Sequence, residues 1–209
     1  MLRAFLKKIQ RKKVWMLHAL SLENYNYSLS RDNFVLFLNY VENELKNGHG
    51  LLTFDDGFDS VYNFAFPILK QKNIPFVCFL VVDFIDTAGY LSSSQIKEMI
   101  QSGLMTIQSH GMTHEVLSNL TESQIKSEIC FSKETLELKF ECSIDSFAYS
   151  HGITSKSAIK SLKKSGYKTA YIATNGLASM FFKNKYAMPR IAIYDRNFNE
   201  IIELYYGKK

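Results

Sequence analysis

The sequence is poor in the residues that mark several protein classes. It has three cysteines, Cys78, Cys130 and Cys142, and no CxxC spacing, so neither a disulfide framework nor a cysteine zinc site is expected. Three prolines and ten glycines exclude collagen-like or low-complexity sequence. No apolar run approaches the roughly 20 residues that cross a bilayer. The short apolar run that follows the basic N-terminal residues, 14–20, is not followed by the small-residue cleavage site of a signal peptide. We therefore expect a cytoplasmic protein with reduced thiols.

Excess positive charge is confined to the first residues of the chain. Residues 1–13 hold six of the 25 Lys and Arg residues and no acid, and the other 19 bases are balanced by 20 acids. Nucleic-acid-binding domains usually carry bases across a whole face, so no nucleic-acid partner is expected. We divide the chain into a basic N-terminal arm, 1–13, and a single domain, 14–209.

The basic arm has the spacing of an amphipathic helix. Leu2, Phe5, Leu6 and Ile9 recur every three or four residues, opposite the bases. This pattern predicts peripheral contact with an anionic membrane, at its inner face if the protein is cytoplasmic. The alternative is a solvated arm that packs on its own domain.

From residue 14 onward, apolar β-rich runs alternate with segments of helical period. Strands are predicted at 14–20, 50–54, 76–82, 104–108, 144–149, 169–173 and 188–193. Helices are predicted at 34–45, 60–70, 93–101, 121–138 and 154–164, the second with Pro67 awkwardly inside it. This alternation predicts an α/β fold with a parallel sheet, either open or closed into a barrel. In both layouts the chemistry lies at the carboxyl ends of the strands.

Polar residues follow three of the predicted strands. Asp55 and Asp56 are costly to bury side by side, although an Asp-Asp-Gly sequence is often only a turn. His110 and His114, four residues apart, can face one metal ion if the chain turns between them. Two imidazoles and one carboxylate would leave positions on a divalent ion for water and substrate. The third segment, which contains His151, is a weak signal alone.

These segments, TFDDG, SHGMTH and FAYSHG, occur in an order that resembles the NodB-type polysaccharide deacetylases, or family 4 carbohydrate esterases. The resemblance covers residues 14–193. It implies a distorted (β/α) barrel of about seven parallel strands with surrounding helices. It also implies a hydrolase that removes N-acetyl groups from an amino sugar in a glycan or glycan precursor.

The resemblance assigns roles to individual residues. It makes Asp55 the general base and makes Asp56, His110 and His114 the ligands of a divalent metal, commonly zinc in this family. Such an ion polarises the amide carbonyl and acidifies the attacking water. A backbone N–H of the third motif, that of His151, would help to hold the oxyanion. His18 and Tyr149 are expected to contact the substrate.

The sequence departs from the family pattern at two points: the residue that orients the general base and the residue that protonates the leaving amine. The Arg that precedes the third motif in the family, where it orients the base, is absent here. Arg190 is the best substitute, and the alternative is an Arg that lies on the surface or only pairs with a carboxylate. The C-terminal Leu-x-His that supplies the general acid is also missing. The leaving amine must take its proton from His151, His18, Asp55 or water, and we prefer His151.

The sequence is also compatible with other functions. One is a deformylase or another amide hydrolase on the same scaffold. Another is a degenerate glycan-binding module without activity, although such a module would not need Asp55 in addition to three metal ligands. With a basic arm and a cytoplasmic location, the expected substrate is an amino-sugar glycan or lipid-linked precursor made inside the cell.

Overall fold

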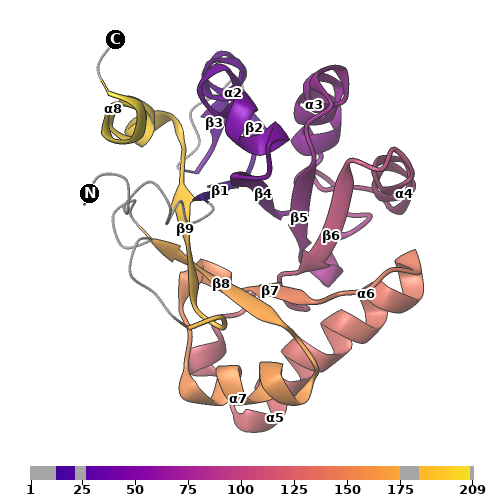
Figure 1. Cartoon of the computed structure of the whole chain (residues 1–209). Coiled ribbons are helices and arrows are strands. Elements are labelled where there is room, and N and C mark those ends of the chain that lie inside the picture. Colours follow the sequence, from indigo (N-terminus) through magenta and orange to yellow (C-terminus); the bar gives the residue numbers. More distant parts are fainter. Residues whose placement is uncertain (1–12, 22–26, 175–183, 208–209) are drawn as a thin grey trace.

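Seven parallel strands close into a barrel in the order β1-β4-β5-β6-β7-β8-β9 (Figure 1). The computed structural model describes residues 13–21, 27–174 and 184–207. The barrel strands are β1 Lys13–Leu17, β4 Gly50–Asp56, β5 Phe76–Leu80, β6 Met105–Ser109, β7 Ser146–Ala148, β8 Thr169–Thr174 and β9 Met188–Ala192. Trp15 of β1 pairs with Leu52 on one side and Ile191 on the other, which closes the barrel. The predicted (β/α) barrel is confirmed.

The barrel is distorted between β6 and β7. These strands are paired only at Ser109 and Phe147, whereas β1 and β4 are paired over five residues. The side chain of Gln108 covers part of this gap, because its Oε1 accepts from the backbone N–H groups of Asp145 (2.9 Å) and Ser146 (2.6 Å). A side-chain amide thus satisfies backbone donors that the short strand β7 leaves without a ladder partner.

Helices surround the barrel (Figure 1). They are α2 Arg31–Lys46, α3 Phe66–Lys72, α4 Ser93–Gln101, α5 Glu122–Lys126, α6 Ser132–Phe140, α7 Lys156–Lys164 and α8 Phe198–Tyr206. Helix α8 and a small parallel pair, β2 Leu20–Ser21 with β3 Leu29–Ser30, were not predicted. None of the described helices has both the length and the apolar character needed to cross a bilayer.

Two of the predicted helices contain a π-helical turn. The first π turn is Val61–Ala65, directly before α3. Pro67 therefore lies in the first turn of α3, where its missing N–H needs no helical partner. The second, Ser127–Phe131, separates α5 from α6. Such turns are frequent at functional sites, and the second one carries a residue of the site described below.

The apolar core has two layers separated by the barrel wall. One small cluster of side chains, which includes Val14, Phe79 and Tyr171, fills the barrel. The larger layer lies between strands and helices, where Trp15 is fully buried. Its ring lies 5.2 Å from that of Phe37 in α2 and 5.4 Å from that of Tyr205 in α8, measured between centroids. One strand residue thus joins two helices that are far apart in sequence.

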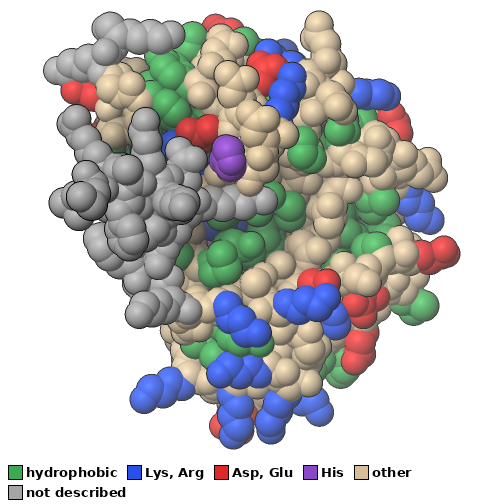
Figure 2. All heavy atoms as spheres, in the orientation of Figure 1, with side chains coloured by type: hydrophobic (Ala, Val, Ile, Leu, Met, Phe, Trp, Pro, Cys, Tyr) green, Lys and Arg blue, Asp and Glu red, His purple; other side chains and the backbone are tan. Residues whose placement is uncertain are grey.

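Positive charge gathers on one side of the molecule (Figure 2). The sequence has no acidic residue from Ser146 to Tyr194. Within this stretch α7 exposes Lys156, Lys160, Lys163 and Lys164. The balanced count of bases and acids after residue 13 therefore conceals a separation of charge in space.

The predicted basic arm lies outside the described residues, apart from Lys13. Lys13 begins β1 and forms an ion pair with Glu44 of α2 at 2.7 Å. The membrane contact and the cytoplasmic location that the arm and the composition suggested stay predictions.

Replacing Trp15 with Ala should lower the free energy of unfolding by about 3–5 kcal/mol, because it empties the contact between β1, α2 and α8. Urea denaturation monitored by circular dichroism measures the loss. Leu138→Ala is the control, since Leu138 is 85% exposed and its change should stay within about 0.5 kcal/mol. Similar losses for the two variants would show that the outer layer does not depend on Trp15.

Candidate active site

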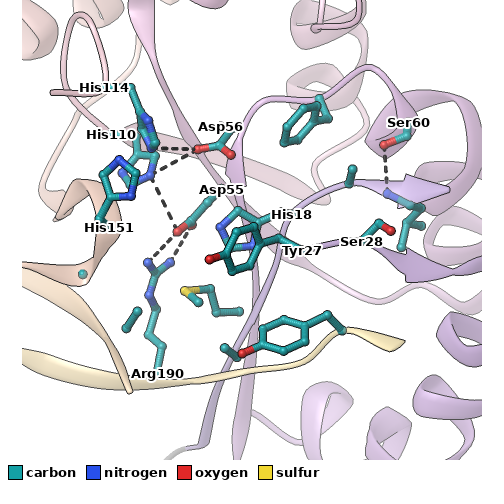
Figure 3. Close-up of a pocket in the computed structure, with 18 of the residues that line it drawn as sticks. His18, Tyr27, Ser28, Asp55, Asp56, Ser60, His110, His114, His151 and Arg190 are labelled. Carbon is teal, nitrogen blue, oxygen red and sulfur yellow. Dashed lines mark hydrogen bonds and ion pairs between the residues drawn. The ribbon is translucent and has the colours of Figure 1, made fainter. Parts of the chain in front are cut away.

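The polar residues at the strand ends line one cavity of about 870 Å³ (Figure 3). Parallel strands present their carboxyl ends to the same side of a barrel, so residues distant in sequence converge there. The cavity contains every candidate residue of the sequence analysis: His18, Asp55, Asp56, His110, His114, Tyr149, His151 and Arg190. Its volume lies within the usual range for ligand pockets.

Asp56, His110 and His114 form a compact three-residue cluster. Oδ1 of Asp56 lies 3.3 Å from Nε2 of His110 and 3.2 Å from Nε2 of His114. One ligand atom from each residue falls within 4.8 Å of the others. The sequence analysis expected these three residues to meet, and the structure brings them together.

The donor set of this cluster fits a divalent metal ion. His110 Nδ1 lies 2.8 Å from the carbonyl oxygen of Ala148, so that nitrogen donates and Nε2 faces Asp56. At 3.3 Å, Nε2 and Oδ1 of Asp56 can share a proton, and a divalent ion could take the place of that proton between them. Donors at about 2.0–2.1 Å from a tetrahedral zinc ion are about 3.3–3.4 Å apart, close to the spacing observed here.

Three residues of the site have a left-handed backbone. The φ angles of Asp56, His114 and His151 are 68°, 71° and 57°. Bulky and β-branched side chains avoid this region, whereas Asp, Asn and His tolerate it better than most. The turn that aims each of these side chains into the cavity is thus built at a cost in backbone energy.

A buried ion pair holds the second carboxylate of the motif. Asp55 and Arg190 are 2% and 1% exposed, and the guanidinium binds both carboxylate oxygens at 2.6 Å. Arg190 Nη1 also donates to Oγ1 of Thr53 at 3.3 Å, and that hydroxyl donates to the backbone oxygen of Trp15. The prediction that a later Arg meets Asp55 agrees with this geometry.

Burial and charge act in opposite directions on the pKa values here. Burial raises the pKa of Asp55, but Arg190 and His110 outweigh it, so the net pKa is below the ordinary carboxyl value. Burial also raises the pKa of Asp56, and contacts with His110 and His114 reverse the direction. Burial lowers the pKa of His110, and Asp55 and Asp56 raise it to a value above normal. Both carboxylates are therefore ionised at neutral pH.

The other candidate residues lie around this centre. The ring of His151 is 5.0 Å from that of His114, between centroids, and the residue is exposed. His18 lies on the opposite wall, and burial lowers its pKa although Asp55 and Asp56 act against this. Tyr149 lines the cavity, but it is 1% exposed, its ring packs in the larger apolar layer and its hydroxyl donates to the backbone oxygen of Tyr186.

Comparison with known families agrees with this geometry. The model of the family described as polysaccharide deacetylase matches residues 42–170, a range that holds Asp55, Asp56, His110 and His114. The chain belongs to the polysaccharide deacetylase family.

Three relatives of this chain illustrate the similarity. The putative polysaccharide deacetylase YxkH of Bacillus subtilis is 32% identical over 68% of this chain and 50% of its own length. The poly-β-1,6-N-acetyl-D-glucosamine N-deacetylase of Staphylococcus aureus is 27% identical over 75% of this chain and 58% of its own. The fold matches the Streptococcus pyogenes deacetylase PplD, solved with acetate, at a TM-score of 0.81, 23% identity, and coverage of 92% and 96%. The chain thus spans about half the length of these curated relatives.

The sequence analysis missed Glu128, which holds the loop that carries His110 and His114. Glu128 lies on the second π turn and is 7% exposed. Its Oε2 accepts from the N–H groups of Met112 (2.8 Å) and Thr113 (3.2 Å), and its Oε1 accepts from the Thr113 hydroxyl (2.7 Å). A Cβ on Gly111 would lie 2.8 Å from Oε2, so only glycine fits there. Nothing in the local sequence links Glu128 to a loop 16 residues earlier.

Glu128→Gln should weaken zinc binding about 10–100-fold, because the loop loses an acceptor that orients both histidines. Isothermal titration with Zn²⁺ measures the affinity. Glu134→Gln is the matched control, since Glu134 is exposed on the neighbouring helix α6. If both variants bind zinc like the wild type, Glu128 does not position the ligands.

Arg190→Gln should destabilise the fold by about 3–5 kcal/mol at pH 7, because it leaves a buried carboxylate without its cation. Asp55 has a folded pKa below its unfolded value, so its contribution to stability is present above the unfolded pKa and lost as pH falls. In the variant, burial raises that pKa, and the deficit relative to wild type should shrink toward pH 4.

A double-mutant cycle with Asp55→Asn separates the ion pair from the loss of each side chain. The double variant should be more stable than the sum of the two single losses implies. Urea denaturation at pH 7 and pH 4 measures all four proteins. Additive losses at both pH values would show that the two residues do not stabilise each other.

Proposed function

We propose that this chain is a metal-dependent hydrolase that removes N-acetyl groups from an amino sugar in a glycan or glycan precursor. The observation that carries the proposal is the position of Asp55. Its Oδ2 lies 3.8 Å from Nε2 of His110, next to the three-residue cluster, while Arg190 holds its carboxylate in one orientation. A module that only bound a metal or a glycan would need no second, separately held carboxylate.

The substrate class is drawn from the printed name of one relative, a deacetylase of poly-β-1,6-N-acetyl-D-glucosamine. An N-acetylated hexosamine polymer or its precursor is therefore the first substrate to test. The half-open cavity, lined by both polar and aromatic residues, has room for more than an acetamido group.

We propose zinc as the metal, with Asp56, His110 and His114 as its ligands. When bound, a divalent ion at this position supplies Lewis acidity for the amide carbonyl and lowers the pKa of the attacking water. The hydrogen bond from His110 to Ala148 fixes the imidazole so that Nε2 would be available to a metal ion held with Asp56 and His114.

Asp55 is placed to act as general base. It is ionised at neutral pH because Arg190 outweighs the effect of burial, and each of its oxygens keeps a lone pair beyond the one that Arg190 occupies. The carboxylate takes one proton from the attacking water, and the C–N bond then breaks to give acetate and a free amine. Arg190 keeps the carboxylate in place throughout, and the backbone N–H of His151 is assigned to the oxyanion.

We assign protonation of the leaving amine to His151. This residue is exposed at the cavity and lies next to His114, whereas burial keeps His18 neutral at pH 7. A general acid needs a proton on the nitrogen that faces the leaving amine, and burial disfavours the doubly protonated imidazolium form of His18. His18 and Tyr149 remain assigned to the substrate-facing wall.

Asp55→Asn should abolish acetate release from an N-acetylglucosamine oligomer while zinc affinity stays within about threefold of wild type. The reason is that the amide keeps the shape of the carboxylate and loses its basicity. Enzymatic acetate assay and zinc titration measure the two properties. Asp83→Asn is the control, because Asp83 is an exposed carboxylate on another loop. A wild-type protein that binds zinc and releases no acetate from such oligomers would favour the glycan-binding module, and faster release of formate from N-formyl oligomers would favour a deformylase.

His151→Asn should lower kcat for the N-acetyl amide about 100-fold and leave kcat for an aryl acetate nearly unchanged, because a phenolate leaves without a proton. Asn is chosen because it tolerates the φ of 57° at this position. His18→Asn serves as the comparison. Selective loss of amide activity in the His18 variant instead would move the role of proton donor to His18.

A further inference from the structure

The cavity has a second wall, opposite the histidines of the metal cluster, built from aromatic rings and one guanidinium. The ring of Tyr27 lies 5.9 Å from that of His18 and 5.9 Å from that of Tyr194, with the two tyrosines edge to face. The guanidinium carbon of Arg196 lies 4.8 Å from the ring centroid of Tyr194 and 5.5 Å from that of Tyr27. All four residues line the same cavity as Asp55 and Asp56. The wall thus leads from the reacting centre to a fixed positive charge.

The charge of Arg196 has no carboxylate partner among the residues that the structure describes. None of the ion pairs found there includes it. The neighbouring Asp195 is committed elsewhere, because its Oδ1 accepts from the Ser30 N–H, the Ser30 hydroxyl and the Asn33 amide at 2.8–3.0 Å. These contacts tie the segment to the start of α2. Among the described residues, Arg196 is therefore held by its backbone and by contacts with Tyr194 and Tyr27, and no carboxylate pairs with it.

A wall of aromatic rings beside a guanidinium suits a sugar that carries an acidic group. Tyr27 is 57% exposed and offers a ring on which the apolar face of a pyranose can lie. The planar fork of an arginine matches carboxylate and phosphate oxygens with two parallel hydrogen bonds. Stacking on Tyr194 and Tyr27 reduces the freedom that the guanidinium would lose on binding an anion.

We propose that Tyr27, Tyr194 and Arg196 form a subsite for an anionic group, a carboxylate or a phosphate, carried on the glycan beside the N-acetylated sugar. This inference rests on the proposed deacetylase function and adds the charge of the substrate to it. Arg196 binds the anion, Tyr27 supports the ring that carries it, and the N-acetyl group lies at Asp55 and the metal ligands. The preferred substrate is then an acidic amino-sugar glycan and not a neutral homopolymer.

The test compares three oligosaccharides of equal length: a neutral N-acetylglucosamine oligomer, the same oligomer with one glucuronate, and the same oligomer with one phosphate. The wild type should show kcat/KM about tenfold higher for at least one anionic oligomer than for the neutral one. In Arg196→Gln the ratio of anionic to neutral kcat/KM should fall to about one. Lys160→Gln is the control, because Lys160 is an exposed base on α7 outside this cavity, and it should keep the wild-type ratio.

Preference for the glucuronate or the phosphate oligomer identifies which anion the subsite takes. Equal kcat/KM for all three oligomers in the wild type, or a preference that survives Arg196→Gln, overturns the proposal. Binding of the same oligomers to Asp55→Asn, measured by calorimetry, separates it from the proposed activity. Tighter binding of an anionic oligomer that depends on Arg196 supports the subsite even if no acetate is released, whereas equal binding of all three removes it.

Discussion

The pairing of Asp55 with Arg190 inside the barrel is the interaction on which the rest of the site depends. Two charges this deeply buried are tolerated only because each meets the other at 2.6 Å on two hydrogen bonds. The pair links β4 to β9 across the intervening strand β1, so it depends on barrel closure and helps to fix it. The next residue, Asp56, and the two histidines then take their positions beside a carboxylate that two hydrogen bonds hold.

The cavity has two chemically different walls around this pair. The wall of Asp56, His110 and His114 is rich in lone pairs and suits a cation. The wall of Tyr27, Tyr194 and Arg196 is aromatic and positive, and suits a sugar with an anion. A substrate that bridges the two walls would be oriented before any bond changes, and such orientation is a large part of the catalytic power of a rigid site.

Much of the barrel could be predicted from sequence because its strands are short apolar runs, three of which lead into Asp or His, and because the segments between them have helical spacing. The three metal ligands followed from residue type and position at strand ends. Helix α8 was missed since it lies beyond the last motif, and the pair β2–β3 since two-residue strands leave no periodic pattern. Glu128 and Arg196 were missed for another reason: each acts through contacts with segments that only the folded chain brings near.

The left-handed backbone at Asp56, His114 and His151 restricts which sequences can build this site. At those positions an amino acid must meet two requirements: its side chain must have the right chemistry, and its main chain must tolerate a positive φ. Few residue types meet both requirements: Asp and His tolerate a positive φ and also bind metals or carry protons, whereas a cysteine thiolate that could bind a metal is poorly suited to that conformation. Replacement by glycine would relax the main chain and remove the functional side chain. At these three residues, the side chain that the chemistry requires therefore raises the conformational energy of the backbone.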